Sequence, residues 1–402
     1  MGTNGEASEA RPVPTASRPL LLLLAFAAGL AVANLYYGQP LAAAIGESLD
    51  APVAAIGTAL TATQIGYALG MILLVPLGDA RERRSLVVTT LACSVPALLL
   101  IAMSRSVPAL IASSLLVGAS SSAVQMIVPY AVDLAPVEQR GRVVGTVMSG
   151  LFAGILLSRT ASGALGAAFG WRAVYLIAAG AMALLGIVLR LVLPRRQPSV
   201  RLAYREVLRS LVVVVRTQPV LRRRAIVGAL GFASFSVFWS MLSYHLKNLG
   251  HGSGTAGLFG AIGVVGVVVA PLVGGYATGP RPSRINMAAL LLCAASFAVF
   301  SFGAASLVAV GVGVVLLDLG VQSNLLTNQT VIYGLDPALR SRINAVYMVM
   351  YFLGGAGGTV AGAVAWSSGG WRAVCATGAV LALAGMLPLL DGKADIRDRK
   401  QA

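Results

Sequence analysis

The chain of 402 residues is 57% hydrophobic and only 11% charged, whereas soluble domains carry about 25% charged residues. This composition excludes an ordinary soluble domain and indicates an integral membrane protein. The net charge of +16 could suggest nucleic-acid binding, but the basic residues fall between apolar segments and report membrane topology instead.

Twelve apolar stretches, each of roughly 20 residues or more, are long enough to cross a bilayer at about 1.5 Å per residue. We predict spans near 20–43, 54–77, 84–104, 107–133, 142–168, 171–193, 225–246, 254–278, 284–304, 306–333, 341–366 and 371–390. With both termini on one side, 25 of the 30 Lys and Arg residues lie on that side and 4 on the other, while Arg159 lies inside a span. The positive-inside rule therefore places both termini in the cytoplasm.

The sequence repeats itself at an offset of 200 residues. Residues 139–154 resemble 339–354, and the Gly-Trp-Arg-Ala-Val of 170–174 recurs identically at 370–374. A parallel repeat of six spans is typical of a transporter built from two bundles. We therefore predict an all-α membrane protein with twelve transmembrane helices in two pseudo-symmetric six-helix bundles.

The predicted domain order follows from these spans and from the charge between them. We expect a cytoplasmic tail (1–19), an N-terminal bundle (20–193), a basic cytoplasmic linker (194–224), a C-terminal bundle (225–390) and a second cytoplasmic tail (391–402). The middle of the linker could form a short helix on the anionic lipid surface. The alternative is a solvated connection whose arginines only fix the topology.

Two charged residues stand inside predicted spans, where a charge costs at least about 2.5–3.5 kcal/mol and is a functional candidate. Arg159 lies in the first half and Asp318 in the second, about 14 Å and about 18 Å from the outer ends of their spans. We predict that Asp318 is the protonatable group that couples proton entry to substrate exit. Arg159 would tune that group or hold an anionic part of the substrate. The alternative is a purely structural ion pair.

Polar side chains recur on one face of several predicted spans, including the first, fourth, seventh and tenth. The candidates for a substrate cavity are Asn34, Tyr37, Gln64, Ser121, Gln125, Ser236, Ser240, Gln322 and Gln329. Helices that face only lipid would not need such stripes, so we predict that they line an aqueous path. The alternative is that the Ser and Gln side chains only join helices to one another.

The loop after the second predicted span contains Asp79, Arg83 and Arg84. A carboxylate beside clustered arginines at a helix end can make charge-assisted hydrogen bonds to a neighbouring helix terminus. We predict that these three residues form a conformational latch. The alternative is an ordinary loop that follows the positive-inside rule.

The cysteines and histidines show no metal-ligand spacing. Cys93, Cys293 and Cys375 lie in apolar spans and are interpreted as core residues. His245 and His251 fall at the outer end of the seventh span and in its loop, and we interpret them as plain loop residues rather than pH sensors. We therefore expect no metal site and no cofactor.

The loop with Asp79, Arg83 and Arg84 resembles the signature loop of the major facilitator superfamily, from which it departs at Ala80 and Glu82. The resemblance extends over all twelve predicted spans and implies two six-helix bundles that alternate access to a cavity at the bilayer midplane.

Within that superfamily, the Ala-Asn-Leu-Tyr-Tyr-Gly-Gln-Pro of residues 33–40 resembles a bacterial group of twelve-span permeases that export drugs and metabolites by proton antiport. The fifth span departs from the antiporter motif, because Ser158 and Arg159 stand where that group has Gly-Pro. The fourth span has Ser114 near the place of the group's arginine.

This resemblance implies a secondary transporter of the bacterial inner membrane that exports a small organic molecule, with protons as the coupling ion. The first alternative is a proton-coupled uptake symporter, and a less favoured one is a non-transporting membrane sensor. A membrane enzyme acting on diphosphates with a metal would need paired aspartates in Asp-x-x-x-Asp spacing, and the sequence has none. We expect no catalytic residues, no nucleic-acid partner and a monomer in the lipid bilayer.

Overall fold

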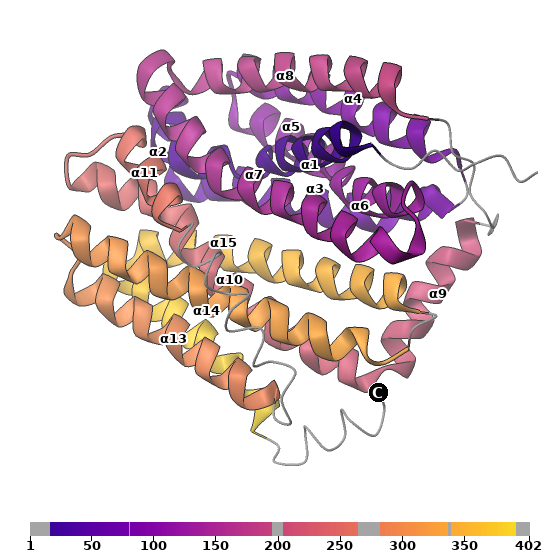
Figure 1. Cartoon of the computed structure of the whole chain (residues 1–402). Helices are drawn as coiled ribbons and strands as arrows, with labels where there is room; N and C mark the ends of the chain where they lie inside the picture. The colour runs from indigo at the N-terminus through magenta and orange to yellow at the C-terminus, as the bar shows by residue number, and fades with distance from the viewer. Residues whose placement is uncertain (1–16, 80, 195–203, 264–281, 337–338, 391–402) are drawn as a thin grey trace, which may run out of the picture.

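The computed structural model of the protein describes residues 17–79, 81–194, 204–263, 282–336 and 339–390. Every regular element in these ranges is a helix. The helices form two groups that lie against each other, with one further helix at one end of both (Figure 1).

The first group, which we call the N-terminal half, contains the helices α1 to α8. They are α1 (Arg18–Ala33), α2 (Gly38–Ser48), α3 (Val53–Leu73), α4 (Arg83–Met103), α5 (Val107–Ser121), α6 (Val124–Asp133), α7 (Arg140–Phe169) and α8 (Trp171–Val192), with short 3-10 turns η1 (Val75–Asp79) and η2 (Val137–Gln139). After it comes α9 (Tyr204–Thr217), so the middle of the predicted basic linker is helical.

The second group, the C-terminal half, begins directly after α9. It contains α10 (Pro219–Asn248), α11 (Ser253–Ile262), α13 (Pro282–Phe302), α14 (Leu307–Tyr333) and α15 (Arg340–Ala384), followed by the 3-10 turn η4 (Leu387–Leu389).

Ten helical segments in the described ranges are long and apolar enough to cross a membrane. The α1–α2 and α5–α6 pairs each count as one segment, and so does the 50-residue stretch from Arg340 to Leu389. That last stretch covers two predicted spans, 341–366 and 371–390. The predicted span at 254–278 begins in α11 and continues into residues 264–281, which lie outside the described residues.

The repeated Gly-Trp-Arg-Ala-Val has a physical reason in the backbone. Gly170 separates α7 from α8 with φ 82° and ψ 159°. At the equivalent place, Gly370 bends α15 with φ 61° and ψ −148°. This region of backbone space is essentially open to glycine alone, because a Cβ atom would clash. The repeat therefore preserves the same sharp corner between consecutive spans in both halves.

The two halves meet through four pairs of helices. The helix α3 packs against α15, α7 against α11, and α2 against both α10 and α11. The α7–α11 contact is close because Gly163 and Gly257 face each other, and the Thr160 hydroxyl donates to the Gly257 carbonyl at 3.1 Å. Elsewhere Thr61 donates to the Ala356 carbonyl. Small residues of this kind let helix backbones approach within a membrane.

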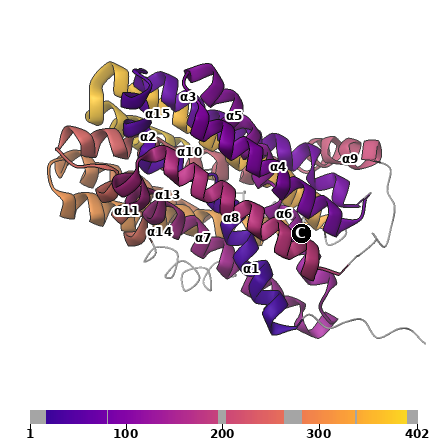
Figure 2. The ribbon, with the colours of Figure 1, turned by 90° about the horizontal axis from the view of Figure 1, so that it is seen from above.

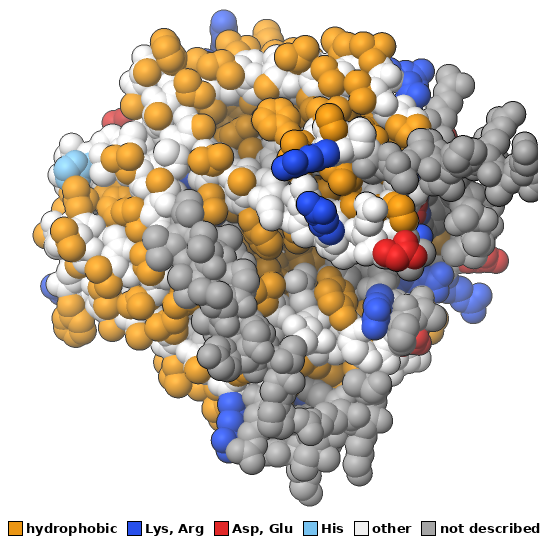
Figure 3. Space-filling model, in the orientation of Figure 1, with side chains coloured by type: hydrophobic (Ala, Val, Ile, Leu, Met, Phe, Trp, Pro, Cys, Tyr) orange, Lys and Arg blue, Asp and Glu red, His pale blue; other side chains and the backbone are white. Residues whose placement is uncertain are grey.

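The helix α9 marks one end of the molecule in both ribbon views (Figures 1 and 2), where it contacts η1, α15 and α10. The contacts between the halves named above use the parts of α3, α7 and α15 farther from this end. In Figure 3, apolar side chains are spread widely over the visible face, while most of the visible Lys and Arg lie in the half of the view that holds α9. Exposed side chains such as Phe302 (93%) and Leu191 (78%) suit contact with lipid tails.

Candidate functional site

Arg159 lies deep inside the molecule on α7, with 1% of its surface exposed. Its Nε donates a hydrogen bond of 2.7 Å to Oε1 of Gln39. Its guanidinium carbon lies 4.2 Å, 4.6 Å and 5.3 Å from the ring centroids of Trp239, Tyr36 and Phe235. Aromatic faces attract a cation, most strongly away from water. The guanidinium therefore joins the two halves, because Tyr36 and Gln39 belong to the first and the other two rings to α10.

A break between α1 and α2 brings Tyr36 and Gln39 to this position. The helix α1 ends at Ala33 and α2 begins at Gly38. Pro40 explains the break, because a proline lacks the backbone N–H and its ring clashes with the carbonyl four residues earlier, here that of Tyr36. The sequence therefore interrupts the helix beside the buried guanidinium.

Asp318 lies on α14 and is 4% exposed. Its Oδ2 is packed against Gly263 at the end of α11, where any side chain would collide with the carboxylate. This oxygen has no hydrogen-bond partner among the described residues. The carboxylate interacts electrostatically with Arg159, and also with Cys293 and Tyr351.

The structure thus brings the two predicted charges together at the interface of the halves. Arg159 and Asp318 are close enough to interact through space. No direct ion pair or hydrogen bond joins them within the described part of the chain, and Nη2 of Arg159 is left without a partner.

The hydroxyls of Ser236 and Ser243 on α10 are also buried and make no hydrogen bond to the described residues. Ser236 was predicted as a cavity residue, and the indole of Trp239 on the same helix lies beside the Asp318 carboxylate and interacts with it. Buried polar groups in proteins are nearly always paired, and an unpaired charge costs far more than an unpaired neutral group. The centre of the molecule therefore offers hydrogen-bonding capacity that its own side chains do not use.

Two predicted cavity residues lie where α3 meets α15. The Gln64 amide nitrogen donates to the Thr359 hydroxyl at 3.0 Å, and its oxygen stays unpaired. Gln125 on α6 donates to the Tyr67 hydroxyl at 2.8 Å, and the Tyr67 ring packs against Phe352 of α15 with centroids 4.4 Å apart.

Asn34 and Tyr37 instead face the interior of the N-terminal half. The Tyr37 ring meets Tyr175 edge to face, with centroids 6.5 Å apart. Asn34 lines a small cavity together with Thr63 and Ser114, and all of its lining residues belong to this half. Both polar atoms of the Asn34 amide are buried without a partner in the described residues.

The remaining predicted cavity residues are not part of the charged centre. Ser121 and Ser240 donate to carbonyls one turn earlier in their own helices, at 2.7 Å and 2.6 Å. Gln322 is partly exposed, and Gln329 makes only a long contact of 3.8 Å with the Met348 sulfur. Back-bonding of a serine to its own helix satisfies the hydroxyl without any ligand.

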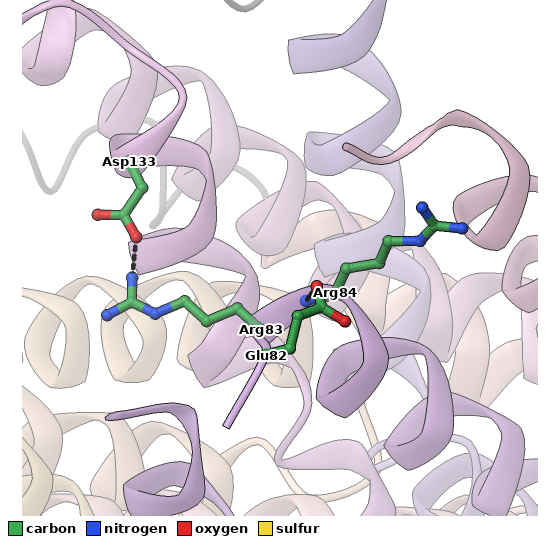
Figure 4. A network of polar contacts seen from close by, with 4 residues as sticks. All are labelled: Glu82, Arg83, Arg84 and Asp133. Carbon is green, nitrogen blue, oxygen red and sulfur yellow. Dashed lines mark hydrogen bonds and ion pairs between the residues drawn. The ribbon is translucent and has the colours of Figure 1, made fainter. Parts of the chain in front are cut away.

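The predicted latch residues Arg83 and Arg84 contact the ends of two neighbouring helices (Figure 4). Arg83 pairs with Asp133 at the end of α6, and Arg84 donates to the Arg190 carbonyl near the end of α8. Glu82 caps α4 by accepting from the backbone N–H of Arg84 at 3.0 Å. These contacts all lie within the N-terminal half. The Asp79 side chain lies outside the described residues.

A buried polar network in the C-terminal half was not predicted. Arg224 was assigned to the linker, but it lies in α10 and is 0% exposed. Its guanidinium donates to Asn286 at 2.9 Å and to Ser283 at 3.1 Å. Asn286 then donates to Asn324 at 2.6 Å, as Asn328 does at 3.2 Å. In the sequence, Arg224 is only the last arginine of a basic triplet that directly precedes an apolar stretch, so nothing distinguished it from a residue of the linker.

The interpretation of His245 as a loop residue is wrong. It lies on α10, is 5% exposed and stacks on the Trp371 ring with centroids 3.8 Å apart. Its Nε2 lies 2.8 Å from the Ala304 carbonyl. His245 falls within the predicted span 225–246, and α10 continues to Asn248, so the imidazole packs inside the helical bundle against Trp371 and not in a loop.

The family is decided by sequence and by fold together. A family model described as the Major Facilitator Superfamily matches residues 21–359. The chain belongs to this superfamily. It is 40% identical over 379 residues to the putative uncharacterized transporter YgaY of Escherichia coli strain K12, covering 94% of this chain and 96% of that one. It is 33% identical over 374 residues to the probable transporter SCO4007 of Streptomyces coelicolor, covering 92% and 87%.

The fold agrees with this assignment. A bacterial homolog of the human lysosomal transporter Spinster, in an inward-facing and occupied conformation, superposes with a TM-score of 0.71 at 15% identity, covering 96% of this chain and 98% of that one. The prediction of the superfamily is confirmed. The protein is a multi-pass membrane transporter of the major facilitator type and not an enzyme, and proteins of this type bind small-molecule substrates within the membrane.

Proposed function

We propose that this transporter exports a small organic molecule from a bacterial cytoplasm by proton antiport, with twelve spans and both termini on the cytoplasmic side. One observation carries the proposal: Arg159 and Asp318 are buried together at the interface of the two halves, and each has a polar atom that no other described residue pairs with. Charges inside a membrane protein are costly and are kept where they serve transport.

The position of the two charges links them to alternating access. One charge stands on each half, so any rocking of the halves changes the distance between them. A proton on Asp318 removes the attraction to Arg159, and a deprotonated Asp318 restores it. Proton binding therefore acts directly on the equilibrium between the two conformations.

Antiport also requires that the proton and the substrate exclude each other. Asp318 meets this requirement if the proton and a part of the substrate compete for its carboxylate. The proton then arrives from the outside, where its concentration is higher, and leaves to the cytoplasm when the site faces inward.

The distribution of charges indicates toward which side of the membrane this conformation is closed. Most of the visible Lys and Arg lie toward the α9 end, which the positive-inside rule assigns to the cytoplasm. The contacts between the halves lie farther from this end, as in the hydrogen bond from Gln64 to Thr359. We therefore assign this conformation as closed toward the outside.

Uptake by proton symport is the second candidate, and the observation that favours it is that Nη2 of Arg159 has no hydrogen-bond partner in the described ranges. An anionic substrate bound there, while Asp318 carries the proton, would move with the proton in the same direction. The two candidates differ in the sign of the response to a pH gradient.

The test uses purified protein in liposomes that contain a pH-sensitive dye, with candidate compounds applied under a pH gradient of either sign. Antiport predicts proton movement opposite to the compound, and symport predicts movement with it. Asp318→Asn should abolish the coupled proton movement, while the matched variant Asp50→Asn, in an exposed turn, should retain it. Full coupled proton movement in Asp318→Asn rejects the proposal.

A further inference from the structure

We infer that the substrate is a zwitterion with a flat apolar part, whose cationic group binds Asp318 and whose anionic group binds Arg159. The inference rests on the proposed function, since it names the ligand of the same site. Three features of the described residues carry it: two opposite charges with unpaired atoms, a glycine edge of α11 that packs against both residues, and a wall of aromatic rings.

The unpaired atoms define the charges that a ligand must bring. Nη2 of Arg159 and Oδ2 of Asp318 are both buried, and neither has a hydrogen-bond partner among the described residues. A ligand with a single positive charge satisfies Asp318 but leaves the guanidinium nitrogen facing a like charge. A ligand with a single negative charge meets the reverse problem at the carboxylate. Only a ligand with both signs satisfies both atoms, because an unpaired buried charge opposes binding.

The helix α11 packs against both charged residues. Gly260 packs against the Cβ atom of Arg159, and Gly263 packs against Oδ2 of Asp318. These glycines are three residues apart, which is about 4.5 Å along a helix. The base of the Arg159 side chain and the Asp318 carboxylate therefore touch one side-chain-free edge of the helix, and the two charges interact through space. Such a pair suits an ammonium and a carboxylate carried by one small molecule, as in an amino acid.

Aromatic rings continue from the charged centre along the interface of the halves. The ring centroids lie 5.9 Å apart for Trp239 and Phe235, 5.6 Å for Phe235 and Phe232, and 4.1 Å for Phe232 and Tyr351. The last step, from Phe232 to Phe352, is 5.3 Å. We call these five residues the aromatic wall. Such faces bind flat apolar groups and give orientation as well as area.

A zwitterion also fits the exchange with a proton. Its ammonium would take the carboxylate that the proton uses, while its carboxylate stays on Arg159. The ionisable groups around Asp318 are Arg159 on α7, Cys293 on α13 and Tyr351 on α15, with the Trp239 indole from α10. Among these neighbours of Asp318, Arg159 is the charged group. The net charge of the site therefore depends on the proton on Asp318 and on the charges that the substrate brings.

The test compares three probes that share one indole ring: tryptophan, tryptamine and indole-3-propionate. They carry both charges, the cation only and the anion only. Binding is measured by isothermal titration to the purified wild-type protein at neutral pH. We expect tryptophan to bind at least tenfold more tightly than either of the others. Equal binding of a singly charged probe, or binding of none of the three, overturns the inference.

Two variants assign the two contacts. In Arg159→Gln, tryptophan should lose its advantage over tryptamine and keep its advantage over indole-3-propionate. In Asp318→Asn the pattern should reverse. Size-exclusion chromatography reports whether each variant is folded, and Arg159→Lys, which keeps the charge, should retain part of the preference. If both variants keep the full wild-type pattern, the probe charges do not bind at these residues and the inference fails.

This assay separates the inference from the proposed function, because it uses neither a membrane nor a pH gradient. Coupled transport of a singly charged compound would reject the zwitterion and leave proton antiport intact. Selective tryptophan binding without any proton coupling in liposomes would reject proton antiport and leave the zwitterion site intact.

Discussion

Two arginines of the described part of the chain are fully buried, and their surroundings differ. Arg224 in the C-terminal half donates to Asn286 and Ser283, within a continuous network of amide side chains. Arg159 at the interface of the halves makes one hydrogen bond, to Gln39, and otherwise rests against aromatic rings. One guanidinium is held by polar groups of a single half, and the other keeps a free nitrogen between two halves.

The difference separates an arginine that stabilises a bundle from one that is available for function. A guanidinium surrounded by fixed acceptors holds its helices in one arrangement, and its network need not change when the halves rock. A guanidinium held by ring faces from both halves can exchange partners, because cation–π contacts are less directional than hydrogen bonds. The first should matter for folding and the second for transport.

Replacement of Arg224 gives the largest effect that this comparison predicts. Arg224→Met removes the hydrogen bonds that the guanidinium donates to the buried oxygens of Asn286 and Ser283. Loss of the donor to a buried neutral acceptor typically costs about 1–3 kcal/mol. We expect a lower melting temperature of the purified protein, or loss of the monodisperse peak in size-exclusion chromatography.

The matched control for this variant is Arg205→Met on the exposed face of α9, which should change stability by no more than about 0.5 kcal/mol. A wild-type melting curve for Arg224→Met would show that the network does not stabilise the C-terminal half. Arg224 could then no longer be contrasted with Arg159 as a structural arginine.

Replacement of Arg159 should give the opposite result. Arg159→Gln removes a charge that has one hydrogen bond and an unpaired nitrogen, so the loss of stability should be small. Transport should fall by at least about a hundredfold, which corresponds to about 2.7 kcal/mol, the size expected when one charged contact to a substrate is lost. The measurements are liposome flux of a transported compound and the melting temperature of the same preparation.

The comparison fails in a different way here. If Arg159→Gln transports normally but melts well below the wild type, Arg159 is a structural residue like Arg224. Arg159→Lys gives a graded check, since a lysine keeps the charge but loses the planar stacking on Trp239 and Tyr36.

Much of this fold could be predicted from the sequence, and the two buried charges of the site as well. An ionisable residue inside an apolar stretch is conspicuous, which is why Arg159 and Asp318 were found. The corner at Gly370 was also visible, because it repeats Gly170 with the same neighbours. Hydropathy and repetition report these features directly, without knowledge of how each helix is turned.

What could not be predicted depends on helix rotation and helix ends. Gln39 and Trp239 contact Arg159 because of the way α2 and α10 are turned, and an apolar pattern does not determine that rotation. Arg224 was hidden within a basic run, since the hydropathy boundary fell just after it. Ser121 was overvalued for a related reason, because a serine on a polar face can satisfy itself within its own helix.

The smallest predicted effect concerns an arginine of a third kind, Arg83, which pairs with Asp133 within the N-terminal half near the α9 end (Figure 4). Both side chains are partly exposed, at 20% and 44%, so water screens the pair. Such pairs contribute about 0.2–1 kcal/mol. Arg83→Gln should therefore lower the melting temperature only slightly, and the exchanged pair Arg83→Asp with Asp133→Arg should recover most of the loss.

The same variant tests the predicted latch, because a latch must change the balance of conformations and not only stability. If Arg83 acts as one, Arg83→Gln should raise the labelling rate of a cysteine that replaces Ala363, where α15 meets Gly57 of the other half. If labelling and transport both stay at the wild-type level, the contact belongs to the N-terminal half alone. The three arginines would then have three different roles. Arg159, shared between the halves, would serve transport, and Arg224, enclosed within one half, would stabilise the fold. Arg83, exposed at an edge, would contribute little to either.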